Sequence, residues 1–125
     1  MFGLFSKKAQ QGPRAMNYRQ IDENIAVTGQ ITEADVAAIA QAGFKSVVCN
    51  RPDEEQGAVP HQAIEKAAAA AGLEFRFIPV GGFGMTPVNV DEMAKAVRDL
   101  PKPMLAYCRS GARSANLYMT AARMR

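Results

Sequence analysis

The sequence predicts an α/β domain in which a central, mainly parallel sheet of four to five strands is flanked by helices on both faces. Short apolar runs alternate with segments that carry helix-start and helix-stop signals, and no internal repeat or low-complexity linker interrupts them. Such alternation favours a parallel sheet, because each helix returns the chain to the edge from which the next strand starts.

The first half of the chain supplies two strands and two helices. The run 24–27 is apolar and ends in a turn, which predicts a first strand. Thr32 and Asp35 have the spacing of a capping box, so we expect a helix to begin there and to end at the next glycine. The β-branched run 44–49 predicts a second strand, and an alanine-rich helix follows over about 60–72.

The second half repeats this order. Aromatic and β-branched residues predict a strand over 75–80, followed by the glycine-rich segment 81–85. A Thr-Pro pair opens a third helix over 86–100, which two prolines end. The apolar run 104–106 predicts the last strand, and a helix is expected over 114–123. Because the carboxyl ends of parallel strands hold the site in such sheets, loops 50–57, 81–87 and 108–114 should converge.

The loop after the last strand carries the chemistry, in the order Tyr107-Cys108-Arg109-Ser110-Gly111-Ala112-Arg113-Ser114. Main-chain N–H groups at a helix start favour negative charge and would stabilise the thiolate of Cys108. Arg113 offers a planar fork for an anion, and Gly111 permits tight curvature. We expect Cys108 and Arg113 to be catalytic, with substrate bound by Arg109, Ser110, Gly111, Ala112 and Ser114.

Composition limits the kinds of partner and substrate that we expect for this chain. The chain has 125 residues, 48% of them hydrophobic and 22% charged, with a net charge of +3. We expect a flexible tail over 1–16 and one catalytic domain over 17–125, in the cytoplasm. A small anionic substrate fits the mild positive charge, whereas the absence of tryptophan and of a basic-aromatic run argues against nucleic acid. We expect no stable membrane insertion, no cofactor and no metal.

The cysteine loop resembles that of rhodanese-type sulfurtransferases, Cys-x-x-Gly-x-Arg. From residue 18 onward the chain resembles the phosphatase-like domain of beta-lactamase hydrolase-like proteins, through segments 27–30, 50–55, 78–80 and the cysteine loop. The second resemblance implies a fold like that of dual-specificity phosphatases, with the cysteine loop at the carboxyl edge of a parallel sheet. It also draws attention to Arg51 and Asp53 as an ion pair that braces the pocket.

The two resemblances imply different reactions. Four residues separate Cys108 from Arg113, whereas cysteine phosphatases have five, and they carry His where Tyr107 stands. Segment 81–87 contains no acidic residue that could protonate an alkoxide leaving group. We therefore rank first a sulfurtransferase that carries sulfane sulfur from thiosulfate or a persulfide on Cys108, with a sulfur-oxidising enzyme as a potential partner.

Two alternatives stay open. One is a dual-specificity- or tyrosine-phosphatase-like hydrolase that acts on a phosphoester through a phosphocysteine at Cys108. The other is an inactive module that binds anions or sulfur carriers. Outside the loop, we expect segment 53–55 to be a solvated turn, Cys49 to lie in the core and His61 to be exposed.

Overall fold

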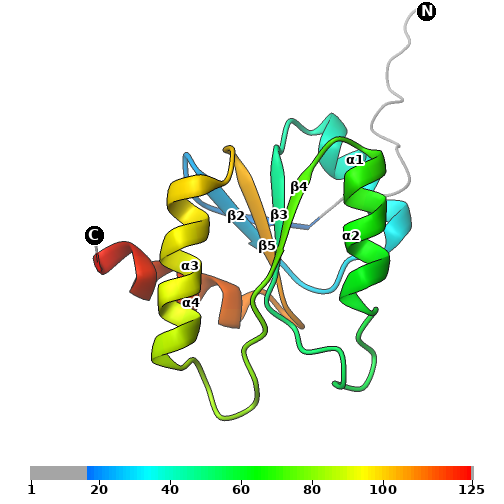
Figure 1. Ribbon diagram of the computed structural model, residues 1–125. Helices are drawn as coiled ribbons and strands as arrows, with labels where there is room; N and C mark the ends of the chain where they lie inside the picture. The colour runs from blue at the N-terminus through cyan, green and yellow to red at the C-terminus, as the bar shows by residue number, and fades with distance from the viewer. Residues whose placement is uncertain (1–16, 125) are drawn as a thin grey trace, which may run out of the picture.

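The computed structural model describes residues 17–124, and the tail expected over 1–16 lies outside this range. Five strands and four helices follow one another in the order expected for an α/β domain (Figure 1). The strands are β1 (Arg19–Asp22), β2 (Ile25–Thr28), β3 (Ser46–Cys49), β4 (Glu74–Phe77) and β5 (Met104–Tyr107). The helices are α1 (Glu33–Gln41), α2 (His61–Ala70), α3 (Pro87–Asp99) and α4 (Ala112–Arg123).

The strands form one sheet in the order β1-β2-β5-β3-β4. The β2, β5, β3 and β4 strands are parallel, and β1 joins the β2 edge antiparallel. Helices α3 and α4 pack on one face and α1 and α2 on the other (Figure 1). The predicted fold class is therefore confirmed: a mainly parallel sheet with helices on both faces.

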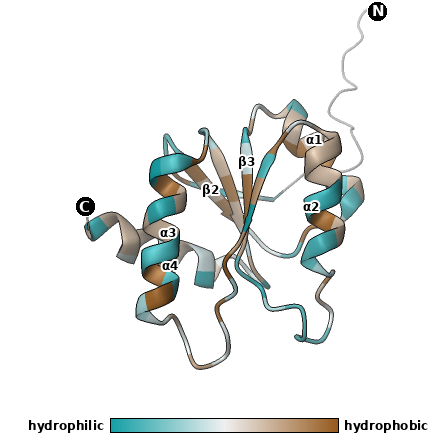
Figure 2. Ribbon diagram, in the orientation of Figure 1, coloured by the Kyte–Doolittle hydropathy of each residue, from teal (hydrophilic) through white to brown (hydrophobic). Residues whose placement is uncertain are grey.

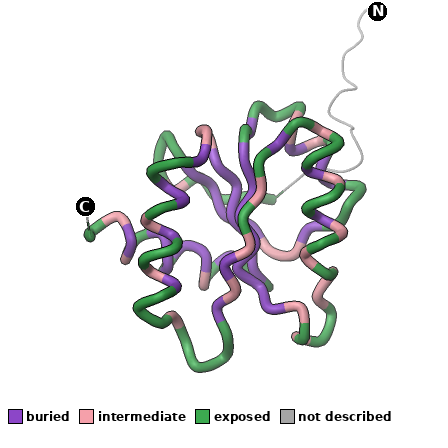
Figure 3. Tube along the Cα trace, in the orientation of Figure 1, coloured by how far each residue is buried: buried purple, intermediate pink, exposed green. Residues whose placement is uncertain are grey.

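The core lies in two layers, one on each side of the sheet. Strands β2, β3 and β5 are buried along their whole length, as the purple centre of Figure 3 shows. Successive side chains of a strand point to opposite faces. Val47 and Leu105 thus join the cluster under α1 and α2, while Val48 and Ala106 join the one under α3 and α4. The apolar stripes on α3 visible in Figure 2 complete the second layer.

Two strands differ from the expected pattern. Strand β1 was not predicted, because it is mostly exposed and its side chains show no apolar alternation. Main-chain pairing with β2 holds it at the sheet edge. Strand β4 ends at Phe77, three residues earlier than expected. Beyond it the chain still follows β3, since the N–H groups of Ile78 and Val80 donate to the carbonyls of Cys49 and Asn50.

Helices α1 and α3 each begin directly after a threonine that forms a capping box. Thr32 N–H donates to the Asp35 carboxylate at 2.8 Å, and Thr86 N–H donates to the Asn89 amide oxygen at 2.9 Å. Helix α4 begins at Ala112, two residues before the expected start, after Gly111. Within residues 17–124, no helix is long and apolar enough to cross a membrane.

The register of the central strands places the loops of interest together. Thr28, Tyr107 and Cys49 are paired across β2, β5 and β3, and each is the last residue of its strand. Gly29, Cys108 and Asn50 therefore leave the sheet side by side at its carboxyl edge. The convergence of loops at this edge builds the candidate site.

Candidate functional site

The side chain of Cys108 is enclosed by its own loop. Cys108 is fully buried, and its Sγ accepts a hydrogen bond from the Gly111 N–H at 3.0 Å. Gly111 makes this turn with a φ of 98°, in the left-handed region that only glycine adopts without strain. The sulfur is thus directed into the strand-to-helix turn, at the positive end of α4.

The loop favours the thiolate. Burial alone would raise the pKa of Cys108, because a buried charge loses its hydration. Hydrogen bonding from the main chain at Ser114, Ser110 and Gly111 lowers the pKa and outweighs that cost. The net result is a pKa of Cys108 below the ordinary value for a thiol.

This lowered pKa makes a direct prediction about reactivity. Because the thiolate is the reactive form, the alkylation rate of Cys108 by iodoacetamide should rise with pH and level off at a lower pH than for a free cysteine. Burial raises the pKa of Cys49, so its alkylation should be slow across the same range. Mass spectrometry of peptides alkylated at each pH reports both sites. A Cys108 profile centred at or above that of free cysteine would contradict the proposed loop electrostatics.

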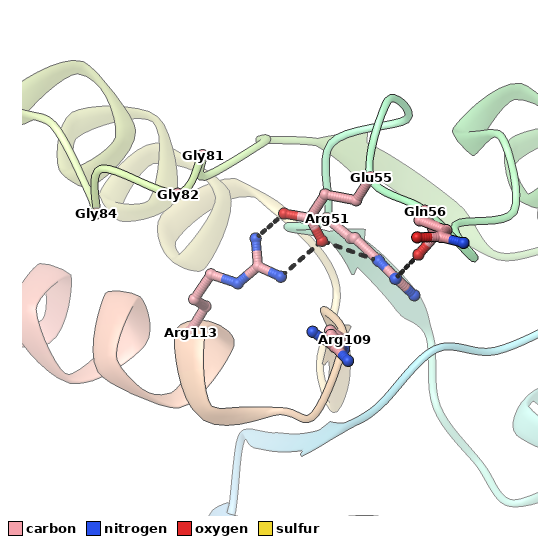
Figure 4. Close-up of a pocket in the computed structure, with 8 residues that line it drawn as sticks. All are labelled: Arg51, Glu55, Gln56, Gly81, Gly82, Gly84, Arg109 and Arg113. Carbon is pink, nitrogen blue, oxygen red and sulfur yellow. Dashed lines mark hydrogen bonds and ion pairs between the residues drawn. The ribbon is translucent and has the colours of Figure 1, made fainter.

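Arg113 and Glu55 form the most prominent polar contact of the site (Figure 4). The two Nη atoms of Arg113 donate to the two carboxylate oxygens of Glu55 at 2.7 and 2.9 Å, and Nη1 also donates to the Val80 carbonyl at 2.7 Å. Three of the five N–H bonds are therefore used. Glu55 is the main cause of a raised pKa for Arg113, which burial opposes and Cys108 reinforces. The hydrogen bond from Arg113 is the main cause of a lowered pKa for Glu55, which burial opposes and Arg51 reinforces.

Glu55 corrects the expectation of a solvated turn over 53–55. Its carboxylate also accepts from Nε of Arg51 at 3.0 Å, so one acid joins two arginines. Arg51 is fixed further by the Gln30 side chain at 3.0 Å and by the Gln56 carbonyl at 2.7 Å. The sequence signal for Glu55 was only its place in a loop expected to converge on the site.

The ion pair between Arg51 and Asp53 to which the family resemblance drew attention is not formed. Arg51 pairs with Glu55, whereas Asp53 caps helix α2 by accepting from the main-chain N–H of His61 at 2.8 Å. The Asp53 carboxylate also contacts His61 Nδ1 at 2.7 Å. Burial opposes these bonds from His61, but they hold the pKa of Asp53 below its usual range.

His61 is half-buried, contrary to the expectation of solvent exposure, and its ring stacks on Phe77 with 3.6 Å between centroids. Cys49 lies in the core, as expected. Both residues stand outside the lining of the pocket described next. Across residues 17–124, no group of three or more His, Cys, Asp and Glu side chains is placed to hold a metal ion.

A cavity of about 630 Å³ opens above the cysteine loop. Three arginines, one acid, one amide and three glycines line it: Arg51, Arg109, Arg113, Glu55, Gln56, Gly81, Gly82 and Gly84 (Figure 4). Cys108 is not one of the lining residues, but Arg113 of the lining interacts with its side chain. The three loops expected to converge do meet here.

The remaining loop residues divide into two groups. Arg109, Ser110 and Ala112 are exposed, and of these only Arg109 lines the cavity. Ser114 is fully buried, and its hydroxyl donates to the Asn50 side chain at 2.8 Å. Gly29 closes the other side of the loop: a Cβ added there would lie 2.8 Å from the Arg109 carbonyl oxygen. A side chain at position 29 would therefore displace the cysteine loop.

Comparison with known proteins identifies the family. The sequence profile of the beta-lactamase hydrolase-like protein, phosphatase-like domain family matches residues 17–123, which is nearly all of the described chain. The chain belongs to this family. Beta-lactamase hydrolase-like proteins from Agrobacterium fabrum and Xylella fastidiosa are 35% and 33% identical over 101 and 104 residues, or 80% and 82% of this chain. The chain spans only 23% and 24% of the length of these two relatives.

Solved structures agree with the phosphatase-like fold. A candidate phosphatase from Neisseria meningitidis is 33% identical, with a TM-score of 0.72 over 80% of this chain and 72% of its own. One from Shewanella putrefaciens, 23% identical, has a TM-score of 0.74 over 91% of this chain and 74% of its own, and supports the fold alone. The comparisons support the phosphatase-like interpretation, ranked second on sequence, better than the sulfurtransferase. A rhodanese-like activity and a sulfur-oxidising partner gain no support from them.

Proposed function

We propose that this phosphatase-like domain is a cysteine-dependent hydrolase of small phosphorylated substrates. The observation that carries the proposal is the Cys108 sulfur held by main-chain N–H groups in a loop whose Arg109 and Arg113 line the cavity, with Arg113 interacting with the sulfur. The site thus combines a stabilised thiolate with cationic groups for the anion that it attacks. Membership of the phosphatase-like family supports the same reaction class.

The reaction needs two steps at one sulfur. The Cys108 thiolate attacks phosphorus, an S–P bond forms, and the bond from phosphorus to the leaving oxygen breaks with its electron pair on that oxygen. Arg113 and the loop N–H groups neutralise the charge that collects on the phosphoryl oxygens. Water then attacks the phosphocysteine, which releases phosphate and restores the thiolate.

Sulfur transfer is a second candidate because of one specific observation. Only four residues lie between Cys108 and Arg113, so the loop is short for a phosphoryl group and would suit a terminal sulfur. In that reaction the thiolate attacks the outer sulfur of thiosulfate, the S–S bond breaks, and sulfite leaves as a stable anion. An acceptor thiol or cyanide then removes the sulfur from Cys108.

Substitution of Cys108 tests the proposal and separates the candidates. We expect p-nitrophenyl phosphate hydrolysis by the wild type, loss of activity to background in Cys108→Ser, and retention in Cys49→Ala, which removes the other thiol. Mass spectrometry of rapidly quenched enzyme should show phosphate on Cys108. Thiosulfate-to-cyanide transfer that depends on Cys108, without phosphatase activity, would replace the proposal with the second candidate. No activity in either assay, with anion binding retained, would leave a binding module.

A further inference from the structure

The cavity holds one guanidinium that the protein does not use. Glu55 supplies the one negative side chain of the lining, and its two oxygens are shared between Arg51 and Arg113. Arg51 is further held by Gln30 and by the Gln56 carbonyl. Among the described residues, Arg109 has no hydrogen-bonding or ionic partner, and Figure 4 shows its guanidinium within the cavity without a dashed contact. The Arg109 guanidinium is therefore available to an anionic group of a ligand, in the same cavity as Arg113.

The cavity is also larger than a single phosphoryl group needs. Its volume of about 630 Å³ lies within the range of ~300–1,000 Å³ typical of sites for whole small-molecule ligands. One wall consists of Gly81, Gly82 and Gly84, which present main chain instead of side chains. A Cβ added at Gly81 or Gly82 would meet no atom within 4 Å, so this wall leaves open space.

The residues that line the cavity also limit which leaving groups the site can release. An alkoxide leaves slowly unless an acid protonates it. Glu55 is the one acid that lines the cavity, and its hydrogen bonds from Arg113, together with those from Arg51, lower its pKa in spite of partial burial. Glu55 is therefore ionised at neutral pH and cannot donate a proton. The reaction at this site is suited to a leaving group that departs as a stable anion.

We infer that the site acts on phosphoanhydrides, with the terminal phosphoryl group at Cys108 and the neighbouring phosphate held by Arg109. This inference rests on the proposed function and assigns its substrate class. The S–P bond forms as the bridging P–O bond breaks, and the electron pair stays on the bridging oxygen of the departing phosphate. A departing phosphate needs little protonation near neutral pH, since the second pKa of a phosphate monoester is about 6. Water then hydrolyses the phosphocysteine and gives its proton to solvent.

Three substrates distinguish the leaving groups. Inorganic pyrophosphate offers an anhydride, p-nitrophenyl phosphate a single phosphate with a stable leaving group, and glycerol 1-phosphate an alkoxide. We expect kcat/KM for pyrophosphate to exceed that for glycerol 1-phosphate by about 100-fold or more, a typical contribution of general acid catalysis. All turnover should disappear in Cys108→Ser.

Arg109→Met tests the second position. A hydrogen bond to a charged group contributes about 1.5–3 kcal/mol, so we expect the ratio of kcat/KM for pyrophosphate to that for p-nitrophenyl phosphate to fall about 10- to 100-fold. Arg19→Met, at an exposed arginine on β1 outside the cavity, is the matched control and should leave this ratio unchanged.

The failures of the two proposals are distinguishable. Absence of Cys108-dependent p-nitrophenyl phosphate hydrolysis would overturn the proposed function and the substrate class with it. Hydrolysis of p-nitrophenyl phosphate with pyrophosphate no better than glycerol 1-phosphate would overturn the substrate class alone. An unchanged substrate ratio in Arg109→Met would likewise remove Arg109 from the second phosphate position.

Discussion

Replacement of Arg113 by lysine is expected to lower kcat/KM for p-nitrophenyl phosphate by about 100- to 1,000-fold, the usual loss when one preorganised charge-stabilising donor is removed. The guanidinium of Arg113 makes two parallel hydrogen bonds to Glu55 and a third to the Val80 carbonyl, which fixes its plane. A lysine keeps the charge but is a single point with no fork, so it cannot reproduce these three hydrogen bonds and the fixed plane that they give to the guanidinium.

The loss should occur without unfolding. The ion pair of Arg113 with Glu55 is partly exposed, at 26% and 27% of the two side chains, and such pairs contribute about 1 kcal/mol or less. Urea denaturation should therefore place Arg113→Lys close to the wild type, and Arg19→Lys serves as the control for the same change outside the site. Activity within threefold of the wild type would show that charge alone suffices at position 113 and would refute the role of its geometry.

The sequence predicted the parts of the fold that local patterns determine. Each helix has a start or stop signal within a few residues, such as the Thr32 and Asp35 cap. The buried strands β3 and β5 are recognisable as apolar runs. Strand β1 has no such pattern, because it is exposed and its pairing with β2 is a main-chain contact that many sequences could make.

The candidate site was also only partly predictable from local sequence patterns. The placement of Cys108 and Arg113 follows from one contiguous loop, so its geometry was accessible from the sequence. The partner of Arg113 was not, because Glu55 lies 58 positions away and only the folded sheet brings the two together. Asp53 and Glu55 are two residues apart in one polar loop, and no local rule indicates which of them faces Arg51.

The absence of a proton donor can now be interpreted differently. On the sequence alone, an acid-free segment 81–87 favoured sulfur transfer over phosphate hydrolysis. The structure adds that the one acid in the cavity lining is neutralised by two arginines, while the family comparisons favour a phosphatase-like domain. Both sets of observations are consistent with a phosphatase whose substrate carries a leaving group that is stable as an anion, so that the enzyme does not need to protonate it.

The largest expected effect on folding comes from Asn50→Ala, which should lower the free energy of unfolding by about 2–4 kcal/mol. Asn50 and Ser114 are both fully buried. The Asn50 side chain donates to the Ile78 carbonyl at 2.9 Å and accepts from the Ser114 hydroxyl at 2.8 Å. Alanine would leave two buried polar groups without their partner, and each such group costs about 1–3 kcal/mol.

This contact also connects stability to the cysteine loop, because it joins the end of β3, the chain beyond β4 and the start of α4. Urea denaturation of Asn50→Ala should show the loss, whereas Asn116→Ala, at an exposed asparagine of α4, should stay within about 0.5 kcal/mol of the wild type. In the double variant with Ser114→Ala, the cost should be smaller than the sum of the single costs, since both changes remove the same hydrogen bond. Additive costs would mean that Asn50 and Ser114 stabilise the fold independently and that this hydrogen bond does not anchor the loop.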